Sequence, residues 1–434
     1  MTLFSFSGGV HPNDNKQITK DKIIEDLKLY RDDIVSIPFS QHLGAPSSAI
    51  VKKKDKVQTG QLIGSAEGMI SANVHSSVTG VVEGITYAPN PILGRILSVN
   101  IKITDEDTDC IKINSSDSFI DMVKNAGIVG LGGATFPSHV KLSPPKKIDT
   151  FIVNGVECEP YLTCDYRLMV EKTEDILKGM DLIRKELKIN NVIVAIEKNK
   201  PEAINIFKKY EKEYAFKVVP LKVVYPQGGE KQLIKSAIKK IVPEGKLPLE
   251  IGVIVHNVGT VLSIYDAFYN QKPLIERVVT VTGSVKEPKN LNVKIGTPVF
   301  KLIEACGGFV GKPRKIIMGG PMMGLTITST NTPVTKSTSG ILVFREENLP
   351  NMTSLNCIRC GKCVRTCPMG LVPPIMEQFS INEMYEKLTD WHVLNCIECG
   401  CCSYVCPSRR PLVAYFKTAK REVLTIVKQR AKNV

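Results

Sequence analysis

The sequence predicts a multidomain α/β protein that ends in a small, cysteine-rich, α-helical domain. Three observations lead to this prediction. Residues 30–100 contain short strand-like runs between frequent glycines, without helical periodicity. Residues 117–270 alternate between helical and strand patterns, which is typical of a doubly wound, Rossmann-like parallel sheet. Two dense cysteine runs then lie in the last quarter of the chain.

The size and composition are those of a globular protein, with 434 residues of which 43% are hydrophobic. Such a chain can form roughly three or four domains. The first residues lack the basic segment and apolar core of a signal peptide, and no apolar run reaches the ~18 residues of a membrane span. We therefore expect a protein of the reducing cytoplasm that has no membrane-spanning segment.

The net charge is +14, and basic residues crowd the C-terminal segment. These residues are Arg409, Arg410, Lys417, Lys420, Arg421, Lys428, Arg430 and Lys432. They form either a solvated helix face or a surface that docks onto an acidic redox partner or an anionic membrane. Nucleic acid is not expected as a partner, because no recognised binding module accompanies the charge.

The first predicted domain covers residues 1–115 and is a barrel-sandwich hybrid. The runs Val51–Gly64 and Ser77–Val82 resemble the half-barrel of lipoyl and biotinyl carriers. Those carriers present a lysine on an exposed hairpin, whereas no lysine occurs between Val57 and Gly80. Met69-Ile70-Ser71 occupies the expected hairpin, so we predict a structural module without a swinging arm.

The second predicted domain, residues 116–272, is the α/β domain. Its expected elements are helix 117–126, strand 150–153, helix 167–187, strand 192–196, helix 202–214, strand 217–224, helix 231–241, strand 251–255 and helix 260–269. Polar residues follow three of these strands, at Asn154 and Glu157, at Tyr225–Glu230 and at His256–Asn257. Open parallel sheets bind ligands at that edge.

A glycine-rich loop, Gly130-Leu-Gly132-Gly133-Ala-Thr-Phe-Pro137, precedes the first strand of this domain. Glycines let backbone N–H groups approach a phosphate closely. The motif alone is weak, because a helix rather than a strand precedes it and Thr135 stands where a dinucleotide loop has its third glycine. A plain turn is an equal alternative.

The third predicted domain, residues 273–345, is a small β-grasp, SLBB-like module. We expect strand 278–283, helix 297–306 and strand 315–318. The stretch Asn331–Gly340 is rich in Thr and Ser, which predicts a linker into the last domain.

The fourth predicted domain, residues 346–434, contains the two cysteine runs. Each run contains the spacing C-x2-C-x2-C-x3-C-P, which wraps a [4Fe-4S] cluster in two-cluster ferredoxins. Zinc sites usually pair two separated hooks, and disulfides need an oxidising compartment, so both alternatives are disfavoured. The runs therefore predict a bis-[4Fe-4S], ferredoxin-like domain that transfers electrons.

The fourth cysteine of each run ligates the other cluster in such ferredoxins. One predicted ligand set is Cys357, Cys360, Cys363 and Cys406. The other predicted set is Cys396, Cys399, Cys402 and Cys367. Cys401 is left over, because only Cys402 keeps both spacings.

Four segments in this order resemble the FMN- and NADH-binding subunit of respiratory complex I and its hydrogenase relatives. The segments are Gly130–Lys141, Asn154-Gly-Val-Glu157-Cys-Glu159-Pro160, Tyr225-Pro-Gln-Gly228-Gly-Glu230 and Val255–Thr260. The resemblance implies bound FMN, NAD(H) as substrate, and FMN contacts at Gly130, Gly132, Gly133, Lys141, Asn154, Glu157, Tyr225, Gly228, Glu230 and Asn257. For Tyr225, packing on the sheet is the alternative to contact with the flavin. Val156, Gly229 and His256 depart from the family pattern and affect the expected nicotinamide contacts.

The combination of half-barrel, flavin domain and two clusters, with Phe6–Pro12 and His42–Pro46, resembles the RnfC family, whose members belong to the Rnf complex. That family implies a peripheral subunit on the cytoplasmic membrane face, held by other Rnf subunits. The complex is a ferredoxin:NAD+ oxidoreductase coupled to Na+ or H+ translocation. Hydride chemistry resides on the flavin, so no catalytic side chain is expected.

Two alternatives remain open from the sequence. One is a flavin and iron–sulfur subunit of a soluble NADH-linked hydrogenase or dehydrogenase. The other is an electron-relay protein that binds no flavin. Co-purification with membrane subunits distinguishes an Rnf subunit from the first alternative. A visible absorption spectrum distinguishes a flavoprotein from the second.

Overall fold

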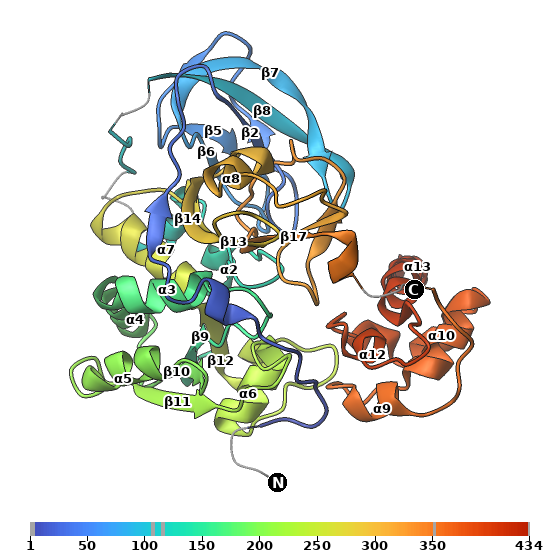
Figure 1. Ribbon diagram of the computed structural model, residues 1–434. Helices are drawn as coiled ribbons and strands as arrows, with labels where there is room; N and C mark the ends of the chain where they lie inside the picture. Colours follow the sequence, from blue (N-terminus) through green and yellow to red (C-terminus); the bar gives the residue numbers. More distant parts are fainter. Residues whose placement is uncertain (1–4, 106–108, 114–117, 350–352, 433–434) are drawn as a thin grey trace.

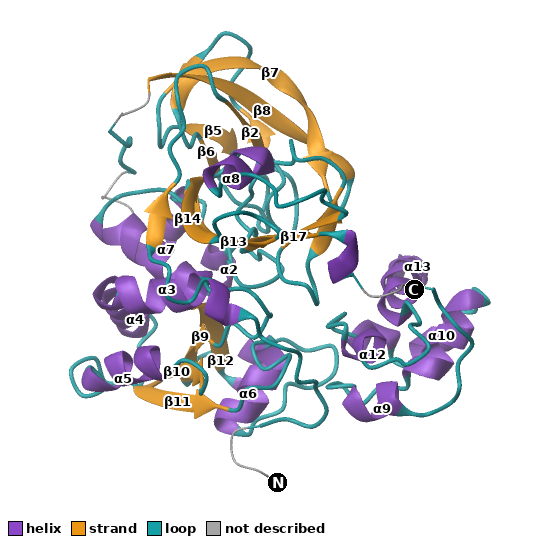
Figure 2. Ribbon diagram, in the orientation of Figure 1, coloured by secondary structure: helices purple, strands orange, loops and turns teal. Residues whose placement is uncertain are grey.

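A computed structural model describes residues 5–105, 109–113, 118–349 and 353–432. Three compact β-containing regions follow one another, and a small helical domain lies to one side of them (Figure 1). Figure 2 shows that the strands gather in the first three regions and that the last contains helices and loops only. The predicted multidomain α/β fold is thereby confirmed. The predicted boundary at 115/116 lies outside the described residues.

The half-barrel is built from two small antiparallel sheets. One sheet has the order β2 (Ile34–Pro38), β8 (Gly94–Asp105), β7 (Thr79–Asn90) and β4 (Lys56–Val57); the other has β3 (Ser48–Ala49), β5 (Leu62–Ser65) and β6 (Val74–His75). Alternate residues point inward, so Val35, Ile37, Val99 and Ile101 are fully buried. The turn that corresponds to the carrier hairpin holds Met69, which is 78% exposed.

The N-terminal segment, residues 5–26, lies outside the two sheets of the half-barrel. β1 (Ile24–Asp26) pairs in parallel with a strand of the third region. Before it, Gly9 N–H donates to Thr366 of the helical domain over 2.9 Å, and Val10 forms a two-way bridge with Tyr225. Figure 1 shows this segment passing below α6 (Glu230–Ile238) and beside α9 (Lys362–Thr366). The segment therefore straps the α/β domain to the helical domain.

The α/β domain has a four-stranded parallel sheet, as its pattern predicts. The strand order is β11 (Lys217–Leu221), β10 (Asn191–Glu197), β9 (Thr150–Gly155) and β12 (Val253–Asn257). Odd and even residues of these strands enter two different cores. One core includes helices α4 (Thr173–Glu186) and α7 (Val258–Tyr269), and the other includes α6. Burial on both faces explains the continuous apolar runs of the strands.

The helix predicted at 167–187 is two helices, α3 (Cys164–Glu171) and α4. Lys172 between them is not helical, with φ −124° and ψ 32°. The hydroxyl of Thr173 donates to the carbonyl of Met169 over 2.6 Å. A threonine that bonds the preceding turn competes with the regular helix ladder, which accounts for the break. The other helices of the domain are α1 (Phe119–Asn125), α2 (Ser138–Lys141) and α5 (Pro201–Lys209).

The third region is a six-stranded sheet with one helix, α8 (Val299–Ala305). Its strand order is β1, β14 (Lys289–Lys294), β13 (Glu276–Gly283), β17 (Gly340–Phe344), β15 (Lys315–Met318) and β16 (Leu325–Ile327). β17 lies in the middle of this sheet, so the stretch 331–340 is an internal connection, and the predicted linker is wrong. Within it Lys336 is 1% exposed.

Lys336 holds three regions together. Its Nζ donates to the carbonyl of Asn73 in the half-barrel over 2.8 Å and to that of Gly127 in the α/β domain over 2.7 Å. Burial lowers the pKa of its ammonium to about 7. A polar, serine- and threonine-rich stretch thus forms part of a packed junction, because the lysine finds carbonyl partners there.

The helical domain contains α9, α10 (Pro373–Ile381), α11 (Tyr385–Asp390), α12 (Cys401–Tyr404) and α13 (Leu412–Lys432). Its core includes Met376, Leu388, Phe416 and Val423. None of the helices in the described part of the chain combines the length and the apolar character that a membrane span requires.

Candidate functional site

The strand order of the α/β sheet reverses between β9 and β12, which is where an open parallel sheet is expected to have its ligand crevice. The chain moves from β9 outward to β11 and then returns to β12 on the other side of β9. Asn154 and Asn257 stand opposite each other in this pair, at the carboxyl ends of their strands. Ligands of open parallel sheets bind at such a reversal of strand order. Two predicted site residues therefore flank the expected crevice.

The glycine-rich loop lies over Asn257. A Cβ on Gly132 would lie 3.0 Å from both Cβ and Nδ2 of Asn257, so the loop approaches this side chain closely. Gly132 and Gly133 are exposed, and a Cβ on Gly133 would meet no atom within 4 Å. The N–H of Gly130 is already used, since it donates to Phe136 over 2.9 Å. The open part of the loop is thus Gly132–Gly133, where the backbone faces solvent without side chains.

Hydrogen bonds from two side chains to the backbone of Leu131 hold the glycine-rich loop in place. Leu131 N–H donates to the hydroxyl of Thr260 over 2.9 Å, and its carbonyl accepts from Arg277 over 3.2 Å. Thr260 lies in the first turn of α7, and Asn257 caps that helix by accepting from Gly259 N–H over 2.8 Å. An anion beside the loop would therefore also lie near a helix N-terminus.

Lys141 and Glu230 bring the first and third predicted motifs together. Lys141 Nζ lies 2.6 Å from Glu230 Oε1, and the two side chains are 24% and 39% exposed. Glu230 is the first residue of α6, where a carboxylate interacts favourably with the helix dipole. Both side chains retain accessible surface, so both remain available to a ligand.

Asn154 and Gly228 are joined directly. Asn154 Nδ2 donates to the Gly228 carbonyl over 3.0 Å, and its Oδ1 accepts from Val156 N–H over 3.1 Å. Gly228 N–H in turn points to the sulfur of Cys158 at 3.3 Å. The Asn154 side chain therefore links the segment 225–230 to the segment 154–160 through hydrogen bonds.

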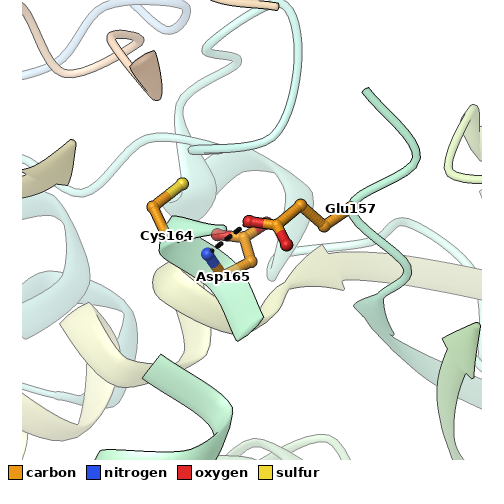
Figure 3. Close-up of side chains that lie close together, drawn as sticks. All are labelled: Glu157, Cys164 and Asp165. Atoms are coloured by element: carbon orange, nitrogen blue, oxygen red, sulfur yellow. Dashed lines mark hydrogen bonds between the residues drawn. The ribbon is translucent and has the colours of Figure 1, made fainter. Parts of the chain in front are cut away.

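Glu157 lies deeper than its motif suggests. Its side chain is 3% exposed, its φ is +48°, and its Oε1 accepts from Asp165 N–H over 2.7 Å. Burial raises the pKa of its carboxyl to about 7. Figure 3 shows Glu157 beside Cys164 and Asp165.

This acidic group is balanced by protein cations. Lys16 Nζ lies 3.7 Å from Glu157 Oε2, and Asp165 Oδ2 accepts from Asn257 Nδ2 over 2.6 Å. Lys200 Nζ donates to the Val156 carbonyl over 2.6 Å. Glu157 and Asp165 therefore both have polar partners within the protein and form a buried support for the neighbouring loops.

Several of these supporting residues were not predicted from the sequence. They are Lys16, Asp165, Lys200 and Arg277, which are all buried. Each is a single charge without a recognisable motif, and their partners lie far away in the chain. Lys16 and Lys200 lie in polar stretches, so their local sequence carries no signal of their buried positions.

Tyr225 is 2% exposed and lies between three segments. Its ring packs in a cluster with Val10, Cys399 and Cys401, and its hydroxyl lies 3.4 Å from Glu159 Oε1. Burial raises the pKa of this phenol. The side chain thus offers almost no surface to a ligand and sits where the α/β domain meets the cysteine loops.

The cysteines gather around two hollows. Cys367, Cys396, Cys399 and Cys402 line the first, and Cys357, Cys360, Cys363 and Cys406 line the second. The structure thus brings together the four members of each predicted set, with the fourth cysteine crossing over from the other run. Four thiols around one hollow fit the ligand requirement of a [4Fe-4S] cluster. Cys401 also borders the first hollow and is fully buried.

The two hollows differ in their surroundings. The first lies against the α/β domain, where Gln232 Nε2 lies 3.1 Å from the sulfur of Met369. A Cβ on Gly400 would lie 2.9 Å from the carbonyl oxygen of Met322 in the third region. The second hollow faces outward, and its Cys357 and Cys360 are exposed.

The sequence matches four families of domains along its length. They are the RnfC barrel sandwich hybrid domain over 4–106, the Nuo51 FMN-binding domain over 123–266, the SLBB domain over 278–326 and the 4Fe-4S dicluster domain over 350–407. The predicted flavin-binding and iron–sulfur domains are thereby confirmed.

Among solved structures, the fold resembles a chain of the NAD+-reducing [NiFe]-hydrogenase in its air-oxidised state. The TM-score is 0.51 at 17% identity, over 64% of this chain and 55% of that chain. The hydrogenase in its H2-reduced state gives a TM-score of 0.52 at 16% identity, over 69% and 62% of the two chains. At these identities the likeness concerns the fold.

Similar proteins cover nearly the whole sequence. The chain is 43% identical to the subunit designated C in the proton-translocating ferredoxin:NAD(+) oxidoreductase complex of Clostridium ljungdahlii, over 97% of this chain and 94% of that protein. It is 42% identical to the subunit of the same designation in the Na(+)-translocating ferredoxin:NAD(+) oxidoreductase complex of Acetobacterium woodii, over 97% of both. The chain therefore belongs to the RnfC family, the family of these subunits in ion-translocating ferredoxin:NAD+ oxidoreductase complexes.

Proposed function

We propose that this chain is the peripheral, NAD(H)-reacting subunit of a membrane ferredoxin:NAD+ oxidoreductase coupled to Na+ or H+ translocation. The names of the two similar proteins and the matches to an FMN-binding and a 4Fe-4S dicluster domain support this proposal. The chain works with other Rnf subunits, which hold it on the cytoplasmic membrane face. Its partners include integral membrane subunits and a ferredoxin-like subunit.

FMN, when bound, converts between the hydride that NAD(H) exchanges and the single electrons that clusters accept. Residues of the α/β crevice hold it. Gly132 and Gly133 give a phosphate access to backbone N–H groups, and Lys141 adds a positive charge. Glu230 lies beside Lys141, and Asn257 lies under the loop. Asn154 and Glu157 do not contact FMN in this proposal; their hydrogen bonds hold the neighbouring loops in place.

The observation that carries the proposal is the contact between the crevice motif and one cysteine hollow. Tyr225, which opens the third motif, packs against Cys399 and Cys401 of the first hollow. Electron tunnelling falls steeply with distance, so a continuous packed contact favours transfer. We infer that the Cys367, Cys396, Cys399 and Cys402 set binds the cluster nearer the flavin. The Cys357, Cys360, Cys363 and Cys406 set then binds the outer cluster.

The test uses the full chain, purified without oxygen and analysed for flavin and iron. We expect FMN, two four-iron clusters, and NADH-dependent reduction of an electron-accepting dye. Full iron content without flavin would favour the electron-relay alternative and contradict the proposal. Purification from the native host should recover integral membrane subunits with the chain, and their absence would favour a soluble dehydrogenase.

A further inference from the structure

We propose that the loop around the outer hollow is a docking surface for an acidic electron-transfer protein, with Arg359, Lys362, Arg365 and Arg409 as its recognition groups. This inference rests on the proposed function, because it concerns how electrons reach the outer cluster. We call these four cations and the apolar residues between them the outer loop surface.

The outer loop surface is accessible and contains exposed apolar residues as well as cations. Ile358 is 67% exposed and Leu355 is 56% exposed. They lie beside Cys357 and Cys360, which are exposed as well. Protein interfaces typically combine apolar residues with a polar rim. An electron donor seated here would come into direct contact with the loop that holds the outer cluster.

The charge of this surface has one sign. The sequence contains no acidic residue between Glu347 and Glu377, and none between Glu398 and Glu422. Glu377 itself is buried and paired with Arg410 at 2.7 Å. Arg359, Lys362, Arg365 and Arg409 are all exposed. In the described part of the chain none of these four forms an ion pair.

The equivalent loop of the other cysteine run, residues 396–402, is covered by other parts of this protein; we call it the inner loop. Ile397, at the position equivalent to Ile358, packs in the cluster with Val10 and Tyr225. Cys401, at the position equivalent to Lys362, is fully buried against the Tyr225 carbonyl. The inner loop is therefore docked onto a protein surface, and its equivalent in the outer run has no such cover among the described residues.

The charges at equivalent positions differ in the same way. Glu398 corresponds to Arg359, and both have a left-handed backbone, with φ +57° and +55°. Glu398 is neutralised within the chain by Lys420 at 2.7 Å. Arg359 has the opposite charge and no such partner in the described chain. A partner that covers the outer loop as the α/β domain covers the inner loop would have to supply carboxylates.

An acidic protein fits this surface better than a lipid headgroup layer. Ile358 and Leu355 are exposed next to the exposed Cys357 and Cys360, so the covering surface needs apolar contacts as well as carboxylates, a combination that protein interfaces provide. Complementary charge steers such encounters and raises their association rate at low ionic strength. We therefore expect a transient complex in which rim carboxylates of the partner meet the four cations.

The experiment measures reduction of the clusters by a probe protein, a reduced two-cluster ferredoxin with an acidic surface. Cluster bleaching is followed by stopped flow at about 50 mM and about 500 mM ionic strength. The test variant is Arg359→Gln/Lys362→Gln/Arg365→Gln/Arg409→Gln. The matched control, Lys28→Gln/Lys52→Gln/Lys53→Gln/Lys56→Gln, removes the same charge from exposed positions in the N-terminal part of the chain.

We expect the test variant to lower the second-order rate constant about tenfold or more at the lower ionic strength and to flatten its salt dependence. The control variant should retain the parent salt dependence. Dithionite, a small reductant that needs no docking, should reduce the parent and both variants alike. A ferredoxin whose carboxylates have been amidated should react with the parent as slowly as the acidic ferredoxin reacts with the test variant.

Equal rate constants for the test and control variants would overturn the proposal. An unchanged rate constant, together with lost retention on phosphatidylglycerol vesicles, would assign the surface to lipid instead. NADH-dependent bleaching of the flavin tests the proposed function separately. If that reaction fails while the ferredoxin reaction remains sensitive to salt and to the four cations, the docking surface stands and the flavin assignment falls.

Discussion

The sulfur of Cys401 lies 3.8 Å from the main-chain carbonyl oxygen of Tyr225. Tyr225 begins the segment that carries Glu230 into the crevice, and Cys401 stands between two cysteines of the first hollow. The same tyrosine bridges Val10 of the N-terminal segment through both backbone groups. Three segments far apart in the chain thus meet where the α/β domain contacts the iron–sulfur domain.

Cys401 should be dispensable for cluster binding. Cys401→Ala is expected to retain about eight iron atoms per chain, whereas Cys402→Ala should retain about four, because Cys402 completes the ferredoxin spacing. Iron analysis and electron paramagnetic resonance of the reduced protein measure this. Loss of a cluster in Cys401→Ala and its retention in Cys402→Ala would reverse the ligand assignment.

Gly9 should be sensitive to a single methyl group. Its φ is +87°, and a Cβ would lie 2.7 Å from the Tyr225 carbonyl oxygen. Gly9→Ala should lower the unfolding midpoint and slow reduction of the clusters by NADH. Gly245→Ala is the matched control, since its φ is +67° and its Cβ would meet nothing within 4 Å. The control should cost about 1 kcal/mol and Gly9→Ala roughly 1–3 kcal/mol more. Equal thermal stability of the two variants would contradict the role of the strap.

Gly132→Val should weaken FMN binding more than any other single change in the loop. The new side chain would press on Asn257 and cover the exposed backbone. We expect a loss of roughly 2 kcal/mol or more, about thirtyfold in Kd, with both clusters retained. Gly84→Val, in open space on β7, is the control. Normal flavin content in the Gly132→Val protein would remove this loop from the site.

Lys141→Ala should lower FMN affinity about tenfold, or ~1.4 kcal/mol, because one positive charge beside the crevice is lost. Lys141→Arg keeps the charge and should recover part of the affinity. Lys146→Ala breaks a comparable ion pair, with Glu250 at 2.7 Å, on the exposed surface. Fluorescence titration with FMN compares the three variants. An equal effect of Lys141→Ala and Lys146→Ala would show that the position of the charge does not matter.

Glu157 should make stability depend on pH. Burial raises the pKa of its carboxyl to about 7 from 4.5, so between these values the folded chain holds a proton that the unfolded chain has released. Its contribution to the free energy of unfolding is full below pH 4.5 and is lost as pH rises through 7.

Glu157→Gln lacks this titration. From pH 5 to pH 8 its free energy of unfolding should rise relative to the parent by roughly 2 to 3 kcal/mol. Denaturant unfolding at the two pH values measures the change, with exposed Glu83→Gln on β7 as the control. A difference between Glu157→Gln and the parent that is the same at both pH values would contradict the buried, protonated carboxyl.

The sequence by itself determined the features that depend on short-range patterns. Apolar strand patterns that alternate with helical periods predicted the four parallel strands of the α/β domain, because backbone geometry and burial act over a few residues. Cysteine spacing predicted two sets of four, and the structure gathers each set around one hollow. The same strand pattern placed Asn154 and Asn257 at strand ends, and the structure sets them opposite each other.

Only the tertiary structure decided which distant segments meet. β1 joins the third region instead of the half-barrel, Lys336 turns a predicted linker into a buried junction, and Asp165 meets Asn257 across 92 positions. The orientation of the helical domain buries one cysteine loop under Tyr225 and exposes the other, although their spacings are the same. The local sequence around one residue of such a contact does not indicate the other residue. The contacts are decided by packing between elements and by the pairing of buried polar groups, both of which depend on the whole fold.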